Sequence, residues 1–590
     1  MKNSFIISAL LWICLVLAGC GTDRDVGKNI YRGALVAKVK GFDPAHVSDL
    51  YSHICQKQVY ESLYQYKYLA RPYDVEPCLA DSLPRISENG LRYSIGFKKG
   101  VYFSDDDCFP GGKGREALPR DFIYSLKRVC DSRTATTGWW LFEGRIKGLD
   151  EYRKMTAALS PDDTVDYFKS LEGLYVNDSG RIIIELKKPC PYFKYILTMA
   201  YTSVVPYEAV NYYKEEFLNN PVGTGPFILE EWWRGQKIFF RKNPSYSHGF
   251  YPSEGESEDR EAGLLEDAGK AVPFLDGLEL SVFRESQPMW LNFLKGNLDA
   301  AGIPKDNYND VVTPGKSLRG KYAAKGITLR KGESLDLTYI IFNFNDPVLG
   351  SSPELRKAVS LAYDTEKMID LFYNGRAIQA HSPIPPGIFG YEEDFRNPWQ
   401  RHDIEAAGKM LEKAGYPGGE GLPEFEYLTS ASTTARQMAE FFAAAMEEIG
   451  IKIKIIGLTF PEMITRFKEN KFQIAGAAWG ADYPDPENFL QLLYGPNASP
   501  GENSACYKNP EYDSLFRLIS VVPDGPERLR SIKRMKEILI TDCPWVFNTH
   551  RLSEALQYKW VKNSKPHAVS GGNYKYIRID TLMRKKMLER

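Results

Sequence analysis

The chain has 590 residues, of which 43% are hydrophobic and 26% are charged, and its formal net charge is −1. These values are typical of a soluble globular protein, and they give no basic excess of the kind that nucleic-acid binding requires. A chain of this length exceeds what one hydrophobic core supports, so two or more lobes are expected. The 36 Tyr, 31 Phe and 10 Trp residues suit recognition surfaces and well-filled clefts.

The first 19 residues are predicted to be a signal peptide. Lys2 is their only charged residue, and the apolar run 5–16 is too short for a lasting membrane helix. This run leads into Leu17-Ala-Gly-Cys20, which resembles a bacterial lipobox and predicts that Cys20 carries a lipid. A plain secretory signal is the alternative, and it would leave Cys20 unexplained. Residues 20–27 would then be a polar tether, anchoring the chain in the cell envelope on the periplasmic or extracytoplasmic face.

Seven of the nine cysteines remain when Cys14 and Cys20 are set aside. Their spacing contains no CxxC pair and no Cys/His pattern typical of zinc, so neither a metal nor a cofactor is expected. An oxidising location permits disulfides, but the spacing fixes no pairing. The odd number leaves at least one thiol free or paired outside the chain.

The first half of the chain contains short strands and one clear helix. Residues 91–97 alternate apolar and polar side chains, as a half-buried strand does, and 118–128 is predicted to be a helix. A glycine and proline turn at 220–227 leads into alternating strands up to Arg241. Residues 252–270 are rich in acids and are interpreted as a mobile surface loop.

From about residue 285, strand and helix patterns alternate. Ser352 followed by proline predicts a helix start, and Gly415 predicts the end of a helix that begins near His402. Residues 451–456 and 472–479 are predicted strands. The pattern is typical of an α/β lobe, in which the methionine and aromatic stripes belong to the core.

The most informative stretch is 472–490, where a predicted strand stops abruptly. Pro484 and Pro486 prevent both strand and helix from continuing through this acidic, aromatic turn. Ligands are often bound at such strand ends in α/β proteins. The alternative is that Asp482 and Asp485 are solvated turn formers.

No known catalytic motif is present. The sequence has no Gly-x-Ser-x-Gly elbow, Walker loop or His-Glu-x-x-His, and its seven histidines are dispersed. The segment Pro110-Gly-Gly-Lys-Gly114 lacks the loop length and the helix of a phosphate-binding loop. The chain is therefore predicted not to be an enzyme.

Short motifs spread over nearly the whole chain after Cys20 resemble the family 5 extracellular solute-binding proteins, the peptide-binding components of ABC importers. These motifs are Phe42-Asp-Pro, Val59-Tyr-Glu-Ser-Leu, Phe103-Ser-Asp, the helix after Arg120, Pro221-Val-Gly-Thr-Gly-Pro-Phe, Phe342-Asn-Phe-Asn, Leu355-Arg-Lys-Ala-Val, Leu411-Glu-Lys-Ala-Gly-Tyr-Pro and Trp479-Gly-Ala-Asp-Tyr-Pro. Their order and number carry the resemblance, since each motif alone is weak.

The resemblance implies an α/β fold, a two-lobed clamshell of the class II periplasmic-binding-protein type with an additional inserted domain. It places lobe I at 28–60, 207–284 and 548–590, the accessory domain at 61–206 and lobe II at 285–547. Two crossing segments would join the lobes, which would close over a ligand.

By the same resemblance, Asp482 would bind the α-ammonium of a peptide. A charge-assisted hydrogen bond of this kind contributes about 1.5–3 kcal/mol. The backbone of Trp479, Gly480 and Ala481 would pair with the ligand main chain like an added strand. Further candidates are Ser48, Asp49 and Leu50 as the facing backbone, Trp139 and Trp140 as cleft aromatics with core packing as their alternative, and Glu285 as a weaker pocket residue.

The predicted function is therefore a lipid-anchored, monomeric binding protein that captures short peptides and delivers them to an ABC permease. Gly476 replaces an arginine that contacts the peptide carboxylate in some relatives, so ligand length is open. The alternatives are a binding protein of the same fold for a sugar or metal chelate, a peptide-sensing surface receptor, and a hydrolase that uses cleft carboxylates.

Overall fold

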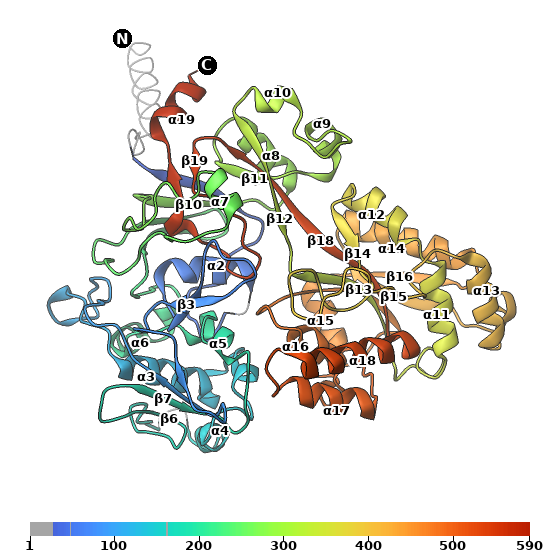
Figure 1. Ribbon diagram of the computed structural model, residues 1–590, viewed down its shortest axis with the longest axis horizontal. Helices are drawn as coiled ribbons and strands as arrows, with labels where there is room; N and C mark the ends of the chain where they lie inside the picture. The colour runs from blue at the N-terminus through green and yellow to red at the C-terminus, as the bar shows by residue number, and fades with distance from the viewer. Residues whose placement is uncertain (1–27, 48, 161–162, 590) are drawn as a thin grey trace, which may run out of the picture.

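The computed structural model describes residues 28–47, 49–160 and 163–589, which form two α/β lobes (Figure 1). The predicted signal peptide, the tether, Cys20 and Ser48 lie outside these residues. Within the described ranges, no helix has the length and apolar character needed to cross a membrane. The seven cysteines in these ranges are all free thiols.

The first lobe is built on a sheet of four strands in the order β1, β10, β9, β8. Strand β1 (Ile30–Leu35) runs parallel to β10 (Gly277–Val282), and the pairs formed with β9 (Lys237–Lys242) and β8 (Phe227–Trp233) are antiparallel. The sheet therefore joins the beginning of the chain to a segment far along it. Helix α2 (Leu50–Val59) follows β1 and packs beside β8.

A second unit, between α2 and β8 in the chain, lies at the lower left of Figure 1. It contains a four-stranded sheet in the order β4, β5, β7, β6, formed by Arg85–Ile86, Arg92–Ile95, Ile182–Glu185 and Leu174–Val176. Helix α3 (Pro119–Cys130) packs against this sheet, and its Phe122, Ile123 and Leu126 are buried. The helix predicted over 118–128 is thus confirmed.

The second lobe is organised on strands β13, β17, β15 and β16. Strand β17 (Ile474–Gly480) is antiparallel to β13 (Asp336–Phe342) and parallel to β15 (Phe425–Ser430), which is also parallel to β16 (Ile453–Leu458). The helices of this lobe include α11 (Pro353–Ala362), α12 (Thr365–Tyr373), α13 (Ile404–Lys413), α14 (Thr433–Glu447), α15 (Phe460–Lys468), the short α16 (Glu487–Leu490), α17 (Pro510–Ile519) and α18 (Pro526–Asp542). Ser352 caps α11 by accepting a hydrogen bond from the backbone N–H of Leu355, as the sequence predicts.

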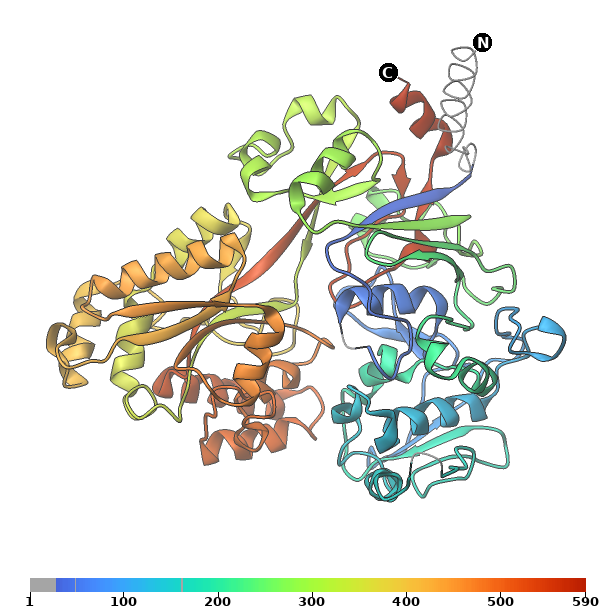
Figure 2. The ribbon, with the colours of Figure 1, turned by 180° about the vertical axis from the view of Figure 1, so that it is seen from behind.

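One long strand, β18 (Trp545–Tyr558), connects the two lobes (Figures 1 and 2). Its first half pairs with β13 and with β14 (Ala377–Gln379) in the second lobe. Its second half pairs with β12 (Ile327–Glu333) and β11 (Ala300–Gly302). Strand β12 continues into β13 through Ser334 and Leu335, so this segment is a second connection between the two halves of the sheet, beside β18.

The segment that carries α8 (Ser286–Leu294), β11 and β12 is attached to the first lobe by the buried Asp299. One Asp299 carboxylate oxygen accepts from the backbone N–H of Arg32 at 2.6 Å, and the other accepts from the indole of Trp560 at 2.7 Å. Both oxygens also accept from Arg584, at 2.6 and 2.7 Å. The boundaries expected for lobe I, the accessory domain and lobe II stay predictions.

The acidic segment 252–270, which is predicted to be a mobile surface loop, is attached to the rest of the fold at two points. It contains a short helix, α7 (Ser257–Glu261), and two of its aspartates are buried. Asp259 accepts from the Lys565 ammonium at 2.8 Å, and Asp267 accepts from Asn563 and Arg578, both at 2.8 Å. The cations come from the C-terminal segment, a pairing that no local pattern reveals.

Candidate functional site

A cavity of about 970 Å³ lies between the lobes. Its wall combines α2 and residues 198–201 on one side with α15 and the end of β17 on the other. The wall also includes residues 333–336, 551 and 553, at the crossing strands, and 566–569 of the C-terminal segment. The volume lies near the upper end of the range of small-molecule sites, so a ligand larger than an amino acid fits.

Asp482 is held at the cavity wall by a buried asparagine. The Asn488 Nδ2 donates to Asp482 Oδ2 at 3.0 Å, and the Asn488 Oδ1 accepts from the backbone N–H of Asp482 at 3.0 Å. The same Oδ1 accepts from the indole N–H of Trp479 at 3.0 Å. One fully buried amide thus fixes both the aspartate and the tryptophan at the end of β17.

The electrostatic surroundings of Asp482 favour a cationic ligand. Burial raises the pKa of its carboxyl to about 6, Glu502 and Glu487 add to this rise, and the Asn488 hydrogen bond opposes it. Among the described residues, no lysine, arginine or histidine forms an ion pair with Asp482. A carboxylate that has lost water without gaining a counter-charge gains most from a bound cation.

The strand that leads to Asp482 has an open edge. β17 pairs with β13 along its whole length, from Ile474 to Gly480. On its other side it pairs with β15 only at Ile474 and Ala475. Within the described part of the chain, the backbone after Ala475 on that side has no strand partner, so an extended chain can add there by main-chain hydrogen bonds.

Comparison with known proteins identifies the family. Residues 74–501 match the bacterial extracellular solute-binding proteins, family 5. The chain belongs to this family. It is 26% identical over 566 residues to Heme-binding protein A of Haemophilus influenzae, an alignment that covers 92% of this chain and 93% of the relative. It is 23% identical over 492 residues to the dipeptide-binding protein of Escherichia coli, covering 81% of each chain.

Solved structures agree with the fold of a family 5 solute-binding protein. The periplasmic binding protein DppA of Helicobacter pylori, solved with the peptide STSA, superposes with a TM-score of 0.72 at 25% identity, covering 93% of this chain and 97% of the other. An oligopeptide-binding protein of Borrelia burgdorferi also gives a TM-score of 0.72, at 21% identity and 94% and 100% coverage. The two-lobed α/β fold expected from the sequence is confirmed.

In this solute-binding protein, six of the predicted site residues line the cavity. They are Leu50, Trp140, Trp479, Gly480, Ala481 and Asp482. Leu50 is 63% exposed on α2 and faces a cavity whose opposite wall carries Phe460, which is 73% exposed. Two large apolar side chains on different lobes are therefore available to a ligand.

The other predicted residues lie elsewhere. Asp49 caps α2 and accepts from the Ser52 backbone N–H at 3.0 Å and the Ser52 hydroxyl at 2.8 Å. The ring of Trp139 lies under the Arg153 guanidinium, 4.7 Å from its centroid. Glu285 is exposed at the start of α8. These three are outside the cavity lining.

Asp485, the second acid of the turn, is not the solvated turn former of the alternative reading. It accepts two hydrogen bonds from the guanidinium of the buried Arg528, at 2.6 and 2.9 Å. This is a buried ion pair, and it holds the turn against α18. The two aspartates of one motif therefore have different roles.

Several cavity residues have no signal in the sequence. Lys57 lies on α2 and Tyr66 ends β2 (Tyr64–Tyr66), whereas His567 comes from the C-terminal segment. Asp336 and Arg551 pair across the crossing strands, with Arg551 Nε 2.5 Å from Asp336 Oδ2. No group of three His, Cys, Asp or Glu side chains in the described ranges is arranged to hold a metal ion.

Proposed function

We propose that this family 5 protein binds short peptides that carry a free amino terminus and delivers them to the permease of an ABC importer. The observation that carries the proposal is Asp482, a fixed carboxylate without a counter-charge at the end of the open edge of β17. The α-ammonium would supply the missing charge, and the ligand main chain would pair with the backbone of Trp479, Gly480 and Ala481. Relatives named for dipeptide binding support the same ligand class.

The binding step is tested with synthetic tripeptide pools by titration calorimetry. The free-amine pool is expected to bind, and acetylation of the amino terminus is expected to weaken binding by at least tenfold. In Asp482→Asn, which keeps the size and one hydrogen-bonding oxygen, the two pools should bind equally weakly. Equal binding of both pools to the wild type would overturn the role of Asp482.

Hemin is the competing ligand, because a relative is named a heme-binding protein. A hemin titration followed by its absorption spectrum, with the peptide pool as competitor, separates the two ligands. Mass spectrometry of ligand that purifies with the protein identifies the natural solute. In a separate experiment, peptide that is unchanged after long incubation with the protein would rule against a hydrolase.

We also propose that Cys20 is lipidated and that the lobes close by bending at 333–336 and 549–553. Detergent phase partition of the full-length chain tests the anchor, since Cys20→Ser should move the protein from the detergent phase to the aqueous phase.

A further inference from the structure

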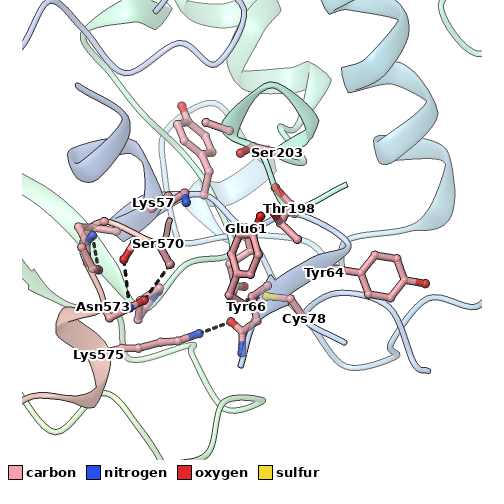
Figure 3. Close-up of a pocket in the computed structure, with 18 of the residues that line it drawn as sticks. Lys57, Glu61, Tyr64, Tyr66, Cys78, Thr198, Ser203, Ser570, Asn573 and Lys575 are labelled. Atoms are coloured by element: carbon pink, nitrogen blue, oxygen red, sulfur yellow. Dashed lines mark hydrogen bonds between the residues drawn. The ribbon is translucent and has the colours of Figure 1, made fainter. Parts of the chain in front are cut away.

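A second polar pocket of about 70 Å³ opens beside the cleft, between α2, β2 and the C-terminal segment (Figure 3). It shares Lys57, Tyr66, Thr198, Ala200 and Gly571 with the cleft wall. These shared residues mark the mouth where the small pocket meets the large cavity. Three of them, Lys57, Tyr66 and Thr198, carry side-chain hydrogen-bond donors.

Lys57 is a cation without a counter-charge. No hydrogen bond or ion pair joins its ammonium to any described residue. Burial lowers the pKa of the Lys57 ammonium to about 8, and no neighbouring carboxylate offsets that effect. The carboxylate of Glu61, four residues after Lys57, instead forms hydrogen bonds with His248 at 2.8 Å, Thr224 at 3.0 Å and Tyr246 at 3.1 Å.

Tyr66 is a second donor without an acceptor. Its side chain is only 5% exposed, and its buried hydroxyl has no hydrogen-bond partner among the described residues. The hydroxyl of the neighbouring Thr198 already donates to the Tyr195 carbonyl at 2.8 Å. A buried phenol at the edge of a cavity gains from an acceptor that a ligand brings.

His567 adds a third donor beside Tyr66, with 5.7 Å between the ring centroids. Its Nδ1 accepts from the backbone N–H of Ser570 at 3.0 Å, so the proton of the neutral ring lies on Nε2. That Nε2 is buried without a partner in the described part of the protein. An ammonium, a phenol and an imidazole N–H thus gather at one side of the cleft, and all three need an acceptor.

We infer that Lys57, Tyr66 and His567 form an anion subsite that binds the terminal carboxylate of the peptide, on the first-lobe side of the cleft. This inference rests on the proposed function and extends it: the ligand is a zwitterion, with Asp482 for its amine and Lys57 for its carboxylate. The cationic side chain comes from α2 rather than from β17. On β17, Gly476 is outside the cavity lining, and a Cβ there would lie 2.7 Å from the Tyr427 hydroxyl.

The test uses degenerate tripeptide pools with either a free carboxylate or a carboxamide at the C-terminus. Wild-type protein is expected to bind the free-acid pool at least tenfold more tightly. Lys57→Met keeps an unbranched side chain that is one atom shorter and removes the charge, and it should bind both pools equally. Tyr66→Phe, which removes only the hydroxyl, should reduce the preference for the acid severalfold.

Lys468→Met is the matched control, because Lys468 lines the opposite wall of the same cleft. This variant should keep the wild-type preference for the free acid. The inference is overturned if the wild type binds the acid and amide pools equally. It is also overturned if Lys57→Met and Tyr66→Phe both keep the preference for the acid pool, or if Lys468→Met loses that preference. Failure of the proposed function is distinct, because then no pool with a free amine would bind the wild type at all.

Discussion

At the scale of single residues, the turn Asp482-Tyr-Pro-Asp485 places two carboxylates in opposite surroundings. Asp482 lies at the cleft with an amide as its partner, whereas Asp485 is neutralised by the buried Arg528. A free carboxylate costs stability and is available to a ligand, and a paired one stabilises the fold. The two can therefore be separated by experiment.

The first prediction concerns pH. Because a bound ammonium favours the ionised carboxylate, binding should lower the Asp482 pKa from the value of about 6 in the empty cleft. Affinity for free-amine peptides should be greatest between that pH and about pH 8, where the α-ammonium begins to lose its proton, and should fall as the pH drops through the Asp482 pKa. At one pH unit below the pKa, about a tenth of the carboxyl is ionised, so Kd should rise about tenfold. Calorimetry at several pH values measures this, and Asp482→Asn should remove the dependence.

The second prediction compares the two aspartates in stability. Asp485→Ala leaves the Arg528 guanidinium buried with only the partly exposed Asp524 as an acid partner, so the free energy of unfolding should fall by about 3–5 kcal/mol. Asp482→Ala should leave it unchanged or raise it. Urea denaturation of both variants measures the difference. Equal destabilisation would contradict these assignments.

At the scale of elements, local signals located the helices and the turn that carries Asp482, but not the other side of the site. Ser352 and Asp403 cap α11 and α13 by accepting from backbone N–H groups three residues on, which a sequence pattern reveals. The open edge of β17 depends on where β15 stops pairing, and the donors at Lys57 and His567 meet only in the folded chain. Asp485 was open to interpretation as a turn former because its partner, Arg528, lies on another helix.

The third prediction concerns the edge of β17. If the peptide adds there as a strand, methylation of one ligand amide nitrogen removes a donor and should weaken binding by about tenfold for each main-chain hydrogen bond lost. Methylation of the amides in turn, measured by calorimetry, should produce an alternating pattern, because successive N–H groups of a strand point to opposite sides. If the loss of affinity does not alternate from one ligand amide to the next, the peptide does not add as a strand.

At the scale of the whole molecule, the exposed Leu50 and Phe460 face one cavity from different lobes. Closure of the lobes around a ligand would remove both from water, which favours the closed state. Ligand affinity should therefore depend on these side chains even when the charged contacts are intact.

The fourth prediction follows from this arrangement. Leu50→Ser and Phe460→Ser should each weaken peptide binding by about tenfold, equivalent to about 1.4 kcal/mol of lost apolar burial. Small-angle X-ray scattering should give a smaller radius of gyration for the wild type when the peptide pool is added. Leu371→Ser, at an exposed leucine outside the cavity lining, is the control and should leave both affinity and closure unchanged.

Strand β18 supplies ladder hydrogen bonds to β13 and β14 with one half and to β11 and β12 with the other. Unfolding of either half of β18 would remove the backbone hydrogen-bond partners of the neighbouring strands. The loss of structure would then extend along β18 into the other lobe. The two lobes are thus thermodynamically linked, and one continuous cluster of buried apolar side chains includes residues of both. Differential scanning calorimetry of the peptide-free protein should record one endotherm, with the calorimetric enthalpy matching the van't Hoff value.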